Sequence, residues 1–219
     1  MSRRRVVITG MGVISPIGND VESAWRALLS GQSGIGTLDL EIFSQYSTTI
    51  AGLVKDFDPL QYGISSKDVR KTDTFIQYGI AAAYQAVHDA GLASGVADPK
   101  RVGVIIGSGI GGLDFIEKTY QTLSSGGPRR VSPFFIPGTI INMISGYVSM
   151  QFGFQGPNLA VSTACTTGCH SIGLAARTIA YGDADIMVAG GAEHASTPLG
   201  MAGFASARAL STRNDNPQE

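Results

Sequence analysis

Residues 158–191 read NLAVSTACTTGCHSIGLAARTIAYGDADIMVAGG, and this stretch sets the expectation for the rest of the chain. Its two ends, 158–162 and 185–190, are short apolar runs with the length of strands. The segment 165–181 between them is long enough for a helix that Gly182 would end. A strand, a helix and a second strand in succession are typical of parallel strands joined by a crossover helix. The stretch therefore predicts one such unit, with Cys165 where the strand gives way to the helix.

The same alternation extends toward the N-terminus. Strands are expected at 6–9, 50–54 and 101–107, and helices at 21–30, 67–90, 113–123 and 137–152. Asn19 or Asp20 would cap the first of these helices. Its apolar side is expected to consist of Trp25, Leu28 and Leu29. Because the strands are continuous apolar runs, we expect an α/β domain whose mostly parallel sheet is covered by helices on both faces.

Composition excludes several classes of protein. Hydrophobic residues make up 43% of the 219 residues and charged residues 15%, which rules out a disordered chain. The 16 Lys and Arg against 17 Asp and Glu predict no attraction to nucleic acid or to an anionic membrane surface. The sequence has no uninterrupted apolar run of about 18 residues, so we expect no membrane span. An apolar run that begins at Val6 is broken by Gly10 and Gly12, which argues against a signal peptide. Only two cysteines occur, which suggests a reducing compartment, and we expect a cytoplasmic protein.

A glycine pattern after the 101–107 strand offers one alternative. Gly107, Gly109 and Gly112 match the spacing of a dinucleotide-binding turn, which also follows a strand and precedes a helix. The acidic residue expected about 20 residues further on is missing, since GGPRRVSP stands there. The pattern therefore favours a tight strand-to-helix turn lining a cavity over a nucleotide site or an oxidoreductase.

The cysteines differ in what their positions predict. Cys165 would lie at a helix N-terminus, where the helix dipole and free backbone N–H groups favour a thiolate and can hold an oxyanion. The residues alone leave a nucleophilic and a structural Cys165 equally open. Cys169 is expected to be a small buried hydrophobic residue. Cys165, Cys169 and His170 do not converge on one tetrahedral ion, so no metal site is expected. His88, His170 and His194 are each interpreted as exposed or satisfied in packing, and His170 is expected to face away from Cys165.

The motifs together resemble one family. The segment TACTTG at 163–168 is similar to the nucleophile segment of β-ketoacyl-acyl carrier protein synthases, most of all the synthase II type of bacterial type II fatty acid synthesis. The similarity extends along nearly the whole chain. It includes VVITGMGVISPIG, KDVRKTDTFIQYGI, IGSGIGG, GGPRRVSPFF, YGDADIMVAGGAE and STPLGMAGFASARALSTRNDNP.

This resemblance implies a thiolase-like fold and a reaction. The family has a five-layered αβαβα fold built from two halves, and residues 1–219 would be the N-terminal domain, ending before the last strand of its half. The implied activity is a decarboxylative Claisen condensation, in which acylated Cys165 is attacked by the carbanion from malonyl-acyl carrier protein. The implied partners are acyl carrier protein, acyl and malonyl thioesters and a second copy in a homodimer, with no metal or organic cofactor. The family's two catalytic His and its Lys match no residue here, so this chain alone is expected not to condense. A non-catalytic half-domain that dimerises or binds acyl carrier protein stays open as the alternative.

Further residues take roles from the resemblance one at a time. Ile110 matches a residue that borders the acyl pocket, Phe204 a pocket-lining aromatic, and Phe135 the segment near the far end of the pocket. A larger set matches basic positions that face the acidic carrier protein: Lys67, Arg70, Lys71, Arg129, Arg130 and Arg208. Cys169 departs from the pattern, because an aliphatic residue is more usual at its position.

Overall fold

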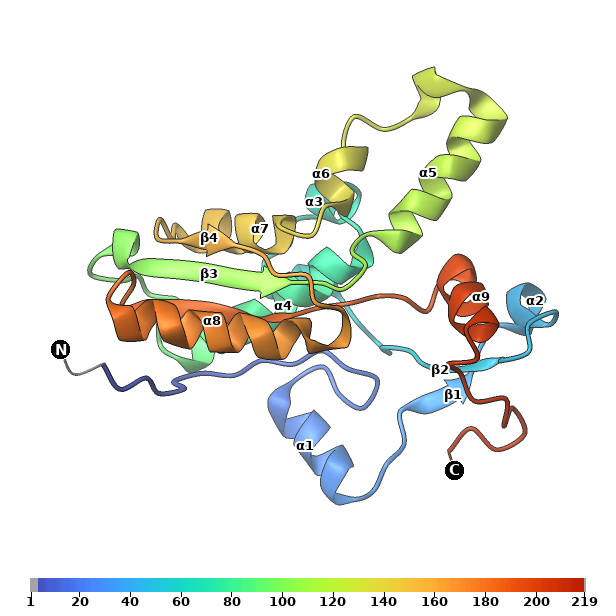
Figure 1. Ribbon diagram of the computed structural model, residues 1–219, viewed down its shortest axis with the longest axis horizontal. Helices are drawn as coiled ribbons and strands as arrows, with labels where there is room; N and C mark the ends of the chain where they lie inside the picture. The colour runs from blue at the N-terminus through green and yellow to red at the C-terminus, as the bar shows by residue number, and fades with distance from the viewer. Residues whose placement is uncertain (1–3, 219) are drawn as a thin grey trace. The chain divides into compact units, whose positions relative to one another are not determined.

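The structure is a computed structural model that describes residues 4–218, and the chain divides into two compact units (Figure 1). The first unit contains residues 4–12 and 58–193, and the second contains residues 13–57 and 194–218. Each unit is considered by itself below.

A parallel sheet forms the centre of the first unit. β3 (Val102–Gly107) lies between β4 (Asn158–Leu159) and β5 (Ile186–Gly191), and both neighbours run parallel to it. Every residue of β3 is buried, as the continuous apolar run predicted. The carboxyl ends of the three strands therefore meet at one edge of the sheet.

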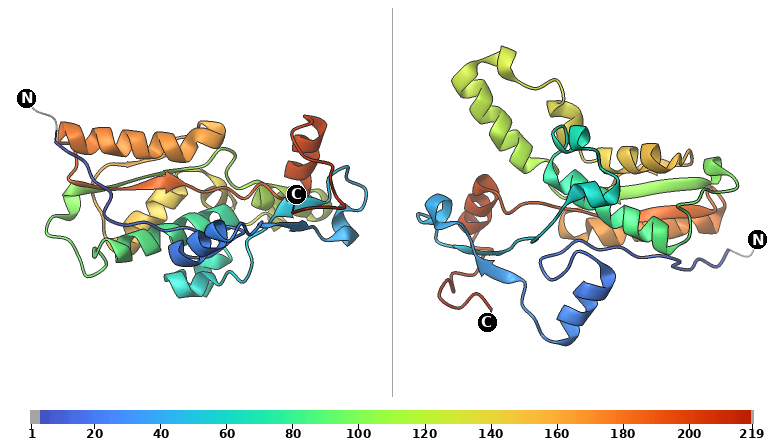
Figure 2. Two further views of the ribbon diagram at one scale, coloured as in Figure 1. Left: turned by 90° about the horizontal axis from the view of Figure 1, so that it is seen from below. Right: turned by 180° about the vertical axis from the view of Figure 1, so that it is seen from behind.

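Helices cover both faces of this sheet, which confirms the predicted α/β architecture. α8 (Thr167–Tyr181) lies on one face, and α4 (Thr74–Asp89) and α7 (Met143–Phe152) lie on the other (Figures 1 and 2). Five fully buried side chains fill the core between α4, α7 and the sheet: those of Phe75, Ile76, Val104, Ile144 and Val148. The remaining elements of the unit are η1 (Pro59–Tyr62), α3 (Ser66–Val69), η2 (Pro99–Arg101), α5 (Leu113–Gly126), η3 (Pro128–Arg130), α6 (Phe135–Thr139) and η4 (Ala164–Thr166).

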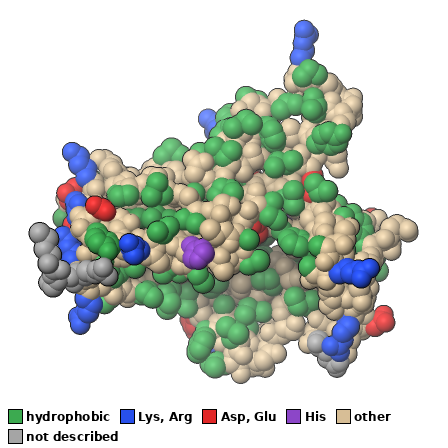
Figure 3. Space-filling view, in the orientation of Figure 1, with side chains coloured by type: hydrophobic (Ala, Val, Ile, Leu, Met, Phe, Trp, Pro, Cys, Tyr) green, Lys and Arg blue, Asp and Glu red, His purple; other side chains and the backbone are tan. Residues whose placement is uncertain are grey.

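Small residues bring α8 close to the sheet. Its buried side consists of Thr167, Ser171 and Ala175, spaced four residues apart along one stripe. A Cβ atom on Gly191 would lie 3.0 Å from the backbone nitrogen of Gly168, so glycine lets the helix start lie close to β5 without a shift of either. The opposite side of α8 carries exposed apolar residues, and Figure 3 shows hydrophobic side chains over α8 and α5.

Two predicted helices are each divided in the structure. The helix predicted at 67–90 is α3 followed by α4, because the Asp73 carboxylate accepts the Phe75 N–H at 3.1 Å and starts a new helix. The helix predicted at 137–152 is α6 followed by α7. Its break follows from Thr139, whose carbonyl accepts the Gly112 N–H at 3.1 Å.

The strand predicted at 6–9 is wrong for the part of the chain that the structure describes. These residues are extended but have no ladder partner there, and Val7 and Ile8 are 63% and 78% exposed. The strand predicted at 158–162 is shorter than expected, because only β4 pairs with β3. Beyond Leu159 the chain leaves the sheet and approaches the turn that carries Cys165.

The second unit has its own small sheet. β1 (Ile35–Thr37) pairs antiparallel with β2 (Ile50–Gly52), which confirms a strand near the predicted 50–54. A small core forms from Leu38, Phe43 and Met201, contributed in part by α2 (Leu40–Phe43) and α9 (Pro198–Ser206). Both of these helices were missed in the sequence, since each is short and lacks an amphipathic pattern.

α1 (Val21–Leu29) begins as predicted, but its covered side differs. Asp20 caps it by accepting the Ser23 N–H at 2.7 Å. The buried residues are Ala24 and Ala27, whereas the predicted apolar side of Trp25, Leu28 and Leu29 is more than half exposed. The loop before the helix packs against the side that contains Ala24, because a Cβ on Gly18 would lie 2.5 Å from the Ala24 nitrogen. That side is therefore the buried one. None of the helices in residues 4–218 is long and apolar enough to cross a membrane.

Candidate functional site

Cys165 lies in the short turn η4, between the end of the β4 segment and the start of α8. Its side chain is exposed. The residue before it, Ala164, has φ of +53°, a left-handed conformation that is uncommon for a residue other than glycine. Such strain persists only where the surrounding structure enforces it, and it is common at functional sites. The chain therefore makes a sharp, strained turn, which exposes the Cys165 thiol at the carboxyl edge of the sheet.

Hydrogen bonds hold this turn on both sides. The Thr163 N–H donates to the Thr167 hydroxyl at 2.9 Å, and the Thr166 hydroxyl donates to the Thr163 carbonyl at 2.8 Å. The Nδ1 atom of His170 lies 2.8 Å from the Thr163 hydroxyl oxygen. His170 was expected to face away from Cys165, and its contact with the residue two positions before the nucleophile was not predicted. A histidine on the second turn of a helix that follows a Thr-rich segment is the signal that would have pointed to it.

The start of α8 is suited to a developing negative charge. Among the described residues, no side chain caps its first turn. Uncapped N–H groups at the positive end of a helix are available to an oxyanion that forms near Cys165. This is the placement that the sequence predicted.

The glycine pattern at 107–112 is a turn built for close approach. A Cβ on Gly107 would lie 1.9 Å from the carbonyl oxygen of Val161, and one on Gly112 would lie 2.6 Å from the Cα of Thr139. The N–H groups of Gly109 and Ile110, which a phosphate would need, both donate to the carboxylate of Glu193, at 2.8 and 2.9 Å. The structure therefore confirms the tight turn. The Glu193 carboxylate occupies the two N–H groups that a bound phosphate would need.

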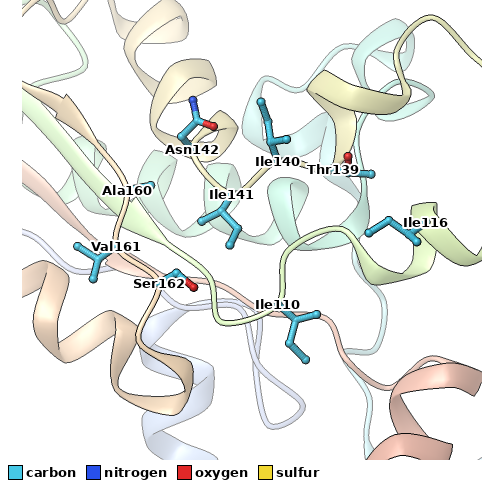
Figure 4. Close-up of a pocket in the computed structure, with 9 residues that line it drawn as sticks. All are labelled: Ile110, Ile116, Thr139, Ile140, Ile141, Asn142, Ala160, Val161 and Ser162. Carbon is cyan, nitrogen blue, oxygen red and sulfur yellow. The ribbon is translucent and has the colours of Figure 1, made fainter.

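An open apolar cavity adjoins this turn. Its volume is about 440 Å³, and three segments line it, from the glycine turn and α5, from the α6–α7 connection, and from the end of the β4 segment (Figure 4). The lining residues are Ile110, Ile116, Thr139, Ile140, Ile141, Asn142, Ala160, Val161 and Ser162. Val161 and Ser162 lead directly into the turn that carries Cys165. Ile110 thus lines an apolar cavity, and its role beside an acyl chain stays a prediction.

The two other predicted pocket residues lie elsewhere. Phe135 is the first residue of α6 and is half-buried, and its ring centroid lies 6.3 Å from that of Phe115. It is not one of the residues that line the cavity. Phe204 is 41% exposed in α9 of the second unit. The first unit therefore brings only Ile110 of the three to the cavity.

Three of the predicted basic residues lie within one short segment. Lys67 belongs to α3 and Arg70 ends that helix, and both are exposed. Lys71 follows directly, with its Nζ 4.4 Å from the centroid of the Phe134 ring. The segment thus carries three positive charges and one acidic residue, Asp68, whose carboxylate lies 2.6 Å from the Ser65 hydroxyl.

The remaining basic residues are placed separately. Arg129 and Arg130 are exposed in η3, at the end of α5. Arg208 is exposed in the second unit and has φ of +55°.

The other candidate side chains divide as follows. Cys169 is exposed, so the prediction of a buried residue is wrong. It follows Thr167 by two positions, which turns it away from the stripe of α8 that faces the sheet.

His88 is exposed, stacks on Tyr84 at 3.9 Å between ring centroids, and has its Nδ1 2.8 Å from the Tyr84 carbonyl, as expected for a packing role. Within the described residues, no group of three or more His, Cys, Asp or Glu side chains could hold a metal ion.

Comparisons with known proteins agree with this geometry. The family described as Beta-ketoacyl synthase, N-terminal domain, matches residues 3–219. The 3-oxoacyl-[acyl-carrier-protein] synthase 2 of Vibrio cholerae is 64% identical over the whole chain, which covers 53% of that relative. The chain thus spans about half the length of the curated relatives it matches.

Two solved structures share the fold. A β-ketoacyl synthase from Burkholderia phymatum has a TM-score of 0.85 at 31% identity, covering 100% of this chain and 53% of its own. A type II PKS ketosynthase, solved with its acyl-carrier protein and bound to the hexaketide, has a TM-score of 0.77 at 32% identity, covering 92% and 55%. The α/β fold is therefore the thiolase-like fold of the ketosynthases. With the family match over all the described residues and the same fold in both solved relatives, this chain belongs to the β-ketoacyl synthases and corresponds to their N-terminal domain.

Proposed function

We propose that Cys165 is the nucleophile that accepts an acyl group from a carrier-protein thioester. The observation that carries this proposal is the exposed thiol on a strained turn, at the uncapped N-terminus of α8 and next to an apolar cavity. The Cys165 sulfur attacks the thioester carbonyl carbon, and the carbonyl oxygen takes up negative charge beside the first N–H groups of α8. The carbon–sulfur bond to the pantetheine arm then breaks, and that thiolate leaves. The product is an acyl-Cys165 whose chain can lie along the apolar cavity.

We propose that the whole protein continues with a condensation. Malonyl-acyl carrier protein loses carbon dioxide, and the resulting carbanion attacks the acyl-Cys165 carbonyl. The Cys165 sulfur leaves as a thiolate, and the β-ketoacyl thioester stays on the carrier protein. Among the described residues of the first unit, the histidine bonded to the nucleophile turn is His170, whose Nδ1 lies 2.8 Å from the Thr163 hydroxyl oxygen. We therefore assign stabilisation of the enolate to groups outside the described site.

A labelling experiment tests the first step. The chain is treated with an acyl thioester of N-acetylcysteamine and with iodoacetamide, and the modified residue is mapped by mass spectrometry. We expect modification at Cys165 to be much faster than at Cys169, because only Cys165 lies at the helix start. Cys165→Ala should abolish acylation, and Cys169→Ala is the matched control that should retain it. Acylation confined to Cys169, or unaffected by Cys165→Ala, would contradict the assignment.

We propose that the segment containing Lys67, Arg70 and Lys71 contacts acyl carrier protein, which we expect to present acidic side chains. The support is the gathering of three positive charges on one segment, with Lys67 and Arg70 exposed and Lys71 half-buried. Reversing two charges in Lys67→Glu with Lys71→Glu should weaken binding about tenfold at low ionic strength, and the loss should shrink as salt screens the surface. Lys100→Glu, on η2, is the matched control. Equal affinities for the double variant and wild type at low salt would exclude this segment as the contact.

We also propose that the protein acts as a homodimer, in the reducing cytoplasm that its two free cysteines favour. The support is β4, an edge strand whose Leu159 is 56% exposed. Light scattering of the purified chain, compared with Leu159→Lys, tests the dimer. A monomer at every concentration in both would contradict it.

A further inference from the structure

Glu193 makes an unusual set of contacts for an exposed residue. It follows the end of β5, and one carboxylate oxygen accepts the Gly109 N–H at 2.8 Å and the Ile110 N–H at 2.9 Å. The other oxygen accepts the Ser108 hydroxyl at 2.9 Å. Three donors on three successive residues thus converge on one side chain. Two of them are backbone groups, so the carboxylate holds the course of the chain as well as its side chains.

These contacts continue into the nucleophile turn. A Cβ on Gly109 would lie 2.8 Å from the Glu193 carboxylate and 3.3 Å from the Cα of Ala164. Gly109 therefore packs close to both Glu193 and Ala164, the residue that precedes Cys165. Its own carbonyl lies 3.3 Å from the Ser162 hydroxyl.

They also continue into the cavity wall. Ser108 is 1% exposed, and its hydroxyl oxygen accepts the Gly111 N–H at 3.1 Å while it donates to Glu193. Ile110 lies between Gly109, which donates to Glu193, and Gly111, which donates to Ser108, and it lines the cavity (Figure 4). Because the residues on both sides of Ile110 are fixed, the position of its side chain depends on the Glu193 carboxylate.

We propose that Glu193 is a positioning residue, which fixes the 108–110 turn and through it the place of Ile110 in the wall of the acyl cavity. This inference rests on the proposed acyl transfer to Cys165. Glu193 is not one of the residues that line the cavity, so its effect on which acyl groups fit passes through Ile110. Discrimination between acyl chains of different length should follow the Ile110 contact.

The experiment compares Glu193→Ala and Glu193→Gln with wild type. The probes are acetyl and octanoyl thioesters of N-acetylcysteamine, and the readout is the ratio of the rates at which they acylate Cys165. One methylene group in an apolar pocket is worth about tenfold or more in rate discrimination, so loss of a single contact should lower the octanoyl-to-acetyl ratio about tenfold in Glu193→Ala. Glu193→Gln should stay near wild type, because its amide oxygen can still accept both backbone N–H groups. Glu22→Ala, a surface glutamate of the second unit, is the matched control.

Two further measurements separate the outcomes. In an Ile110→Ala background, Glu193→Ala should change the ratio no further, since the effect passes through Ile110. Hydrogen exchange at the Gly109 and Ile110 amides should be faster in Glu193→Ala than in wild type, and this is read whether or not Cys165 reacts. Unchanged exchange overturns the bracing role, and faster exchange with an unchanged ratio overturns the specificity role. If wild type accepts neither thioester, the proposed acyl transfer fails and the specificity role with it, while the exchange data still decide whether Glu193 holds the turn.

Discussion

Replacing Ser145 by alanine is expected to destabilise the first unit by about 1.5 kcal/mol, although the change removes one oxygen atom. Ser145 lies on α7 with a side chain that is 0% exposed, and its hydroxyl stands between two strands of the sheet. It accepts the Ile106 N–H at 2.9 Å and donates to the Leu159 carbonyl at 2.7 Å. The serine thus joins β3 to the last residue of β4, at the point where the pairing of the two strands ends.

The magnitude follows from what the alanine variant leaves unpaired. Ile106 is 4% exposed, so its N–H cannot reach water, and an orphaned buried donor costs about 1–3 kcal/mol. The Leu159 carbonyl belongs to an exposed residue, and water can replace the hydroxyl there. Alanine also favours a helix over serine by about 0.5 kcal/mol, which offsets part of the loss. For a chain of this size, the net loss should lower the midpoint of thermal unfolding by about 5 °C.

The assay is thermal unfolding followed by circular dichroism, together with hydrogen exchange at the Ile106 amide. Ser125→Ala is the matched control, because that exposed serine donates only to the Gln121 carbonyl of its own helix, at 2.8 Å. We expect Ser125→Ala to leave the midpoint unchanged or slightly raised. Equal midpoints for Ser145→Ala and wild type, with unchanged exchange at Ile106, would refute the reasoning.

Gly107→Ala should destabilise the first unit by about 3 kcal/mol, because the added Cβ would lie 1.9 Å from the carbonyl oxygen of Val161. Gly190→Ala is the control and should be tolerated, because no atom lies within 4 Å of its Cβ position. The midpoints of urea unfolding of the two variants and wild type check this prediction. Asp185 accepts bonds from Arg101, at 3.0 and 3.1 Å, and from Arg4, and these partners hold the pKa of its carboxyl well below the ordinary value of 3.8. Because its folded pKa is depressed, its contribution to stability is complete above about pH 4 and is lost as the pH falls further, so the stability difference between wild type and Asp185→Asn should shrink on acidification. A difference that stays constant from pH 6 to pH 2 in urea titrations would show that these ion pairs contribute no pH dependence.

Much of the first unit follows from local pattern, and its exceptions have physical causes. The β3 run and the α8 helix with its Gly182 end were predictable, because burial on both faces and a glycine stop leave clear signals in sequence. The division at Asp73 was not, because a capping aspartate inside an otherwise helical segment is only recognised when its carboxylate bonds the next turn.

The candidate site also has features that the sequence predicts and features that it does not. The position of Cys165 between a strand and a helix follows from residue order alone, and so does the glycine turn. The bonds that hold those turns come from Glu193 and His170, which are distant in sequence or reach backward over a helix start. Sequence spacing carries no information about such contacts, and the exposure of Trp25 and Cys169 was mispredicted because it depends on neighbours that pack from elsewhere in the chain.

The left-handed Ala164 has a consequence for how this chain can change over evolution. Glycine would adopt the same backbone angle without steric cost, so Ala164→Gly is a substitution that relieves strain and can raise stability. It would also free the turn that presents Cys165, since glycine restricts the neighbouring angles less than alanine does. Selection for stability and selection for a well-oriented thiol therefore favour different residues at this position. β-Branched side chains are excluded by both, which leaves position 164 a very small set of acceptable amino acids.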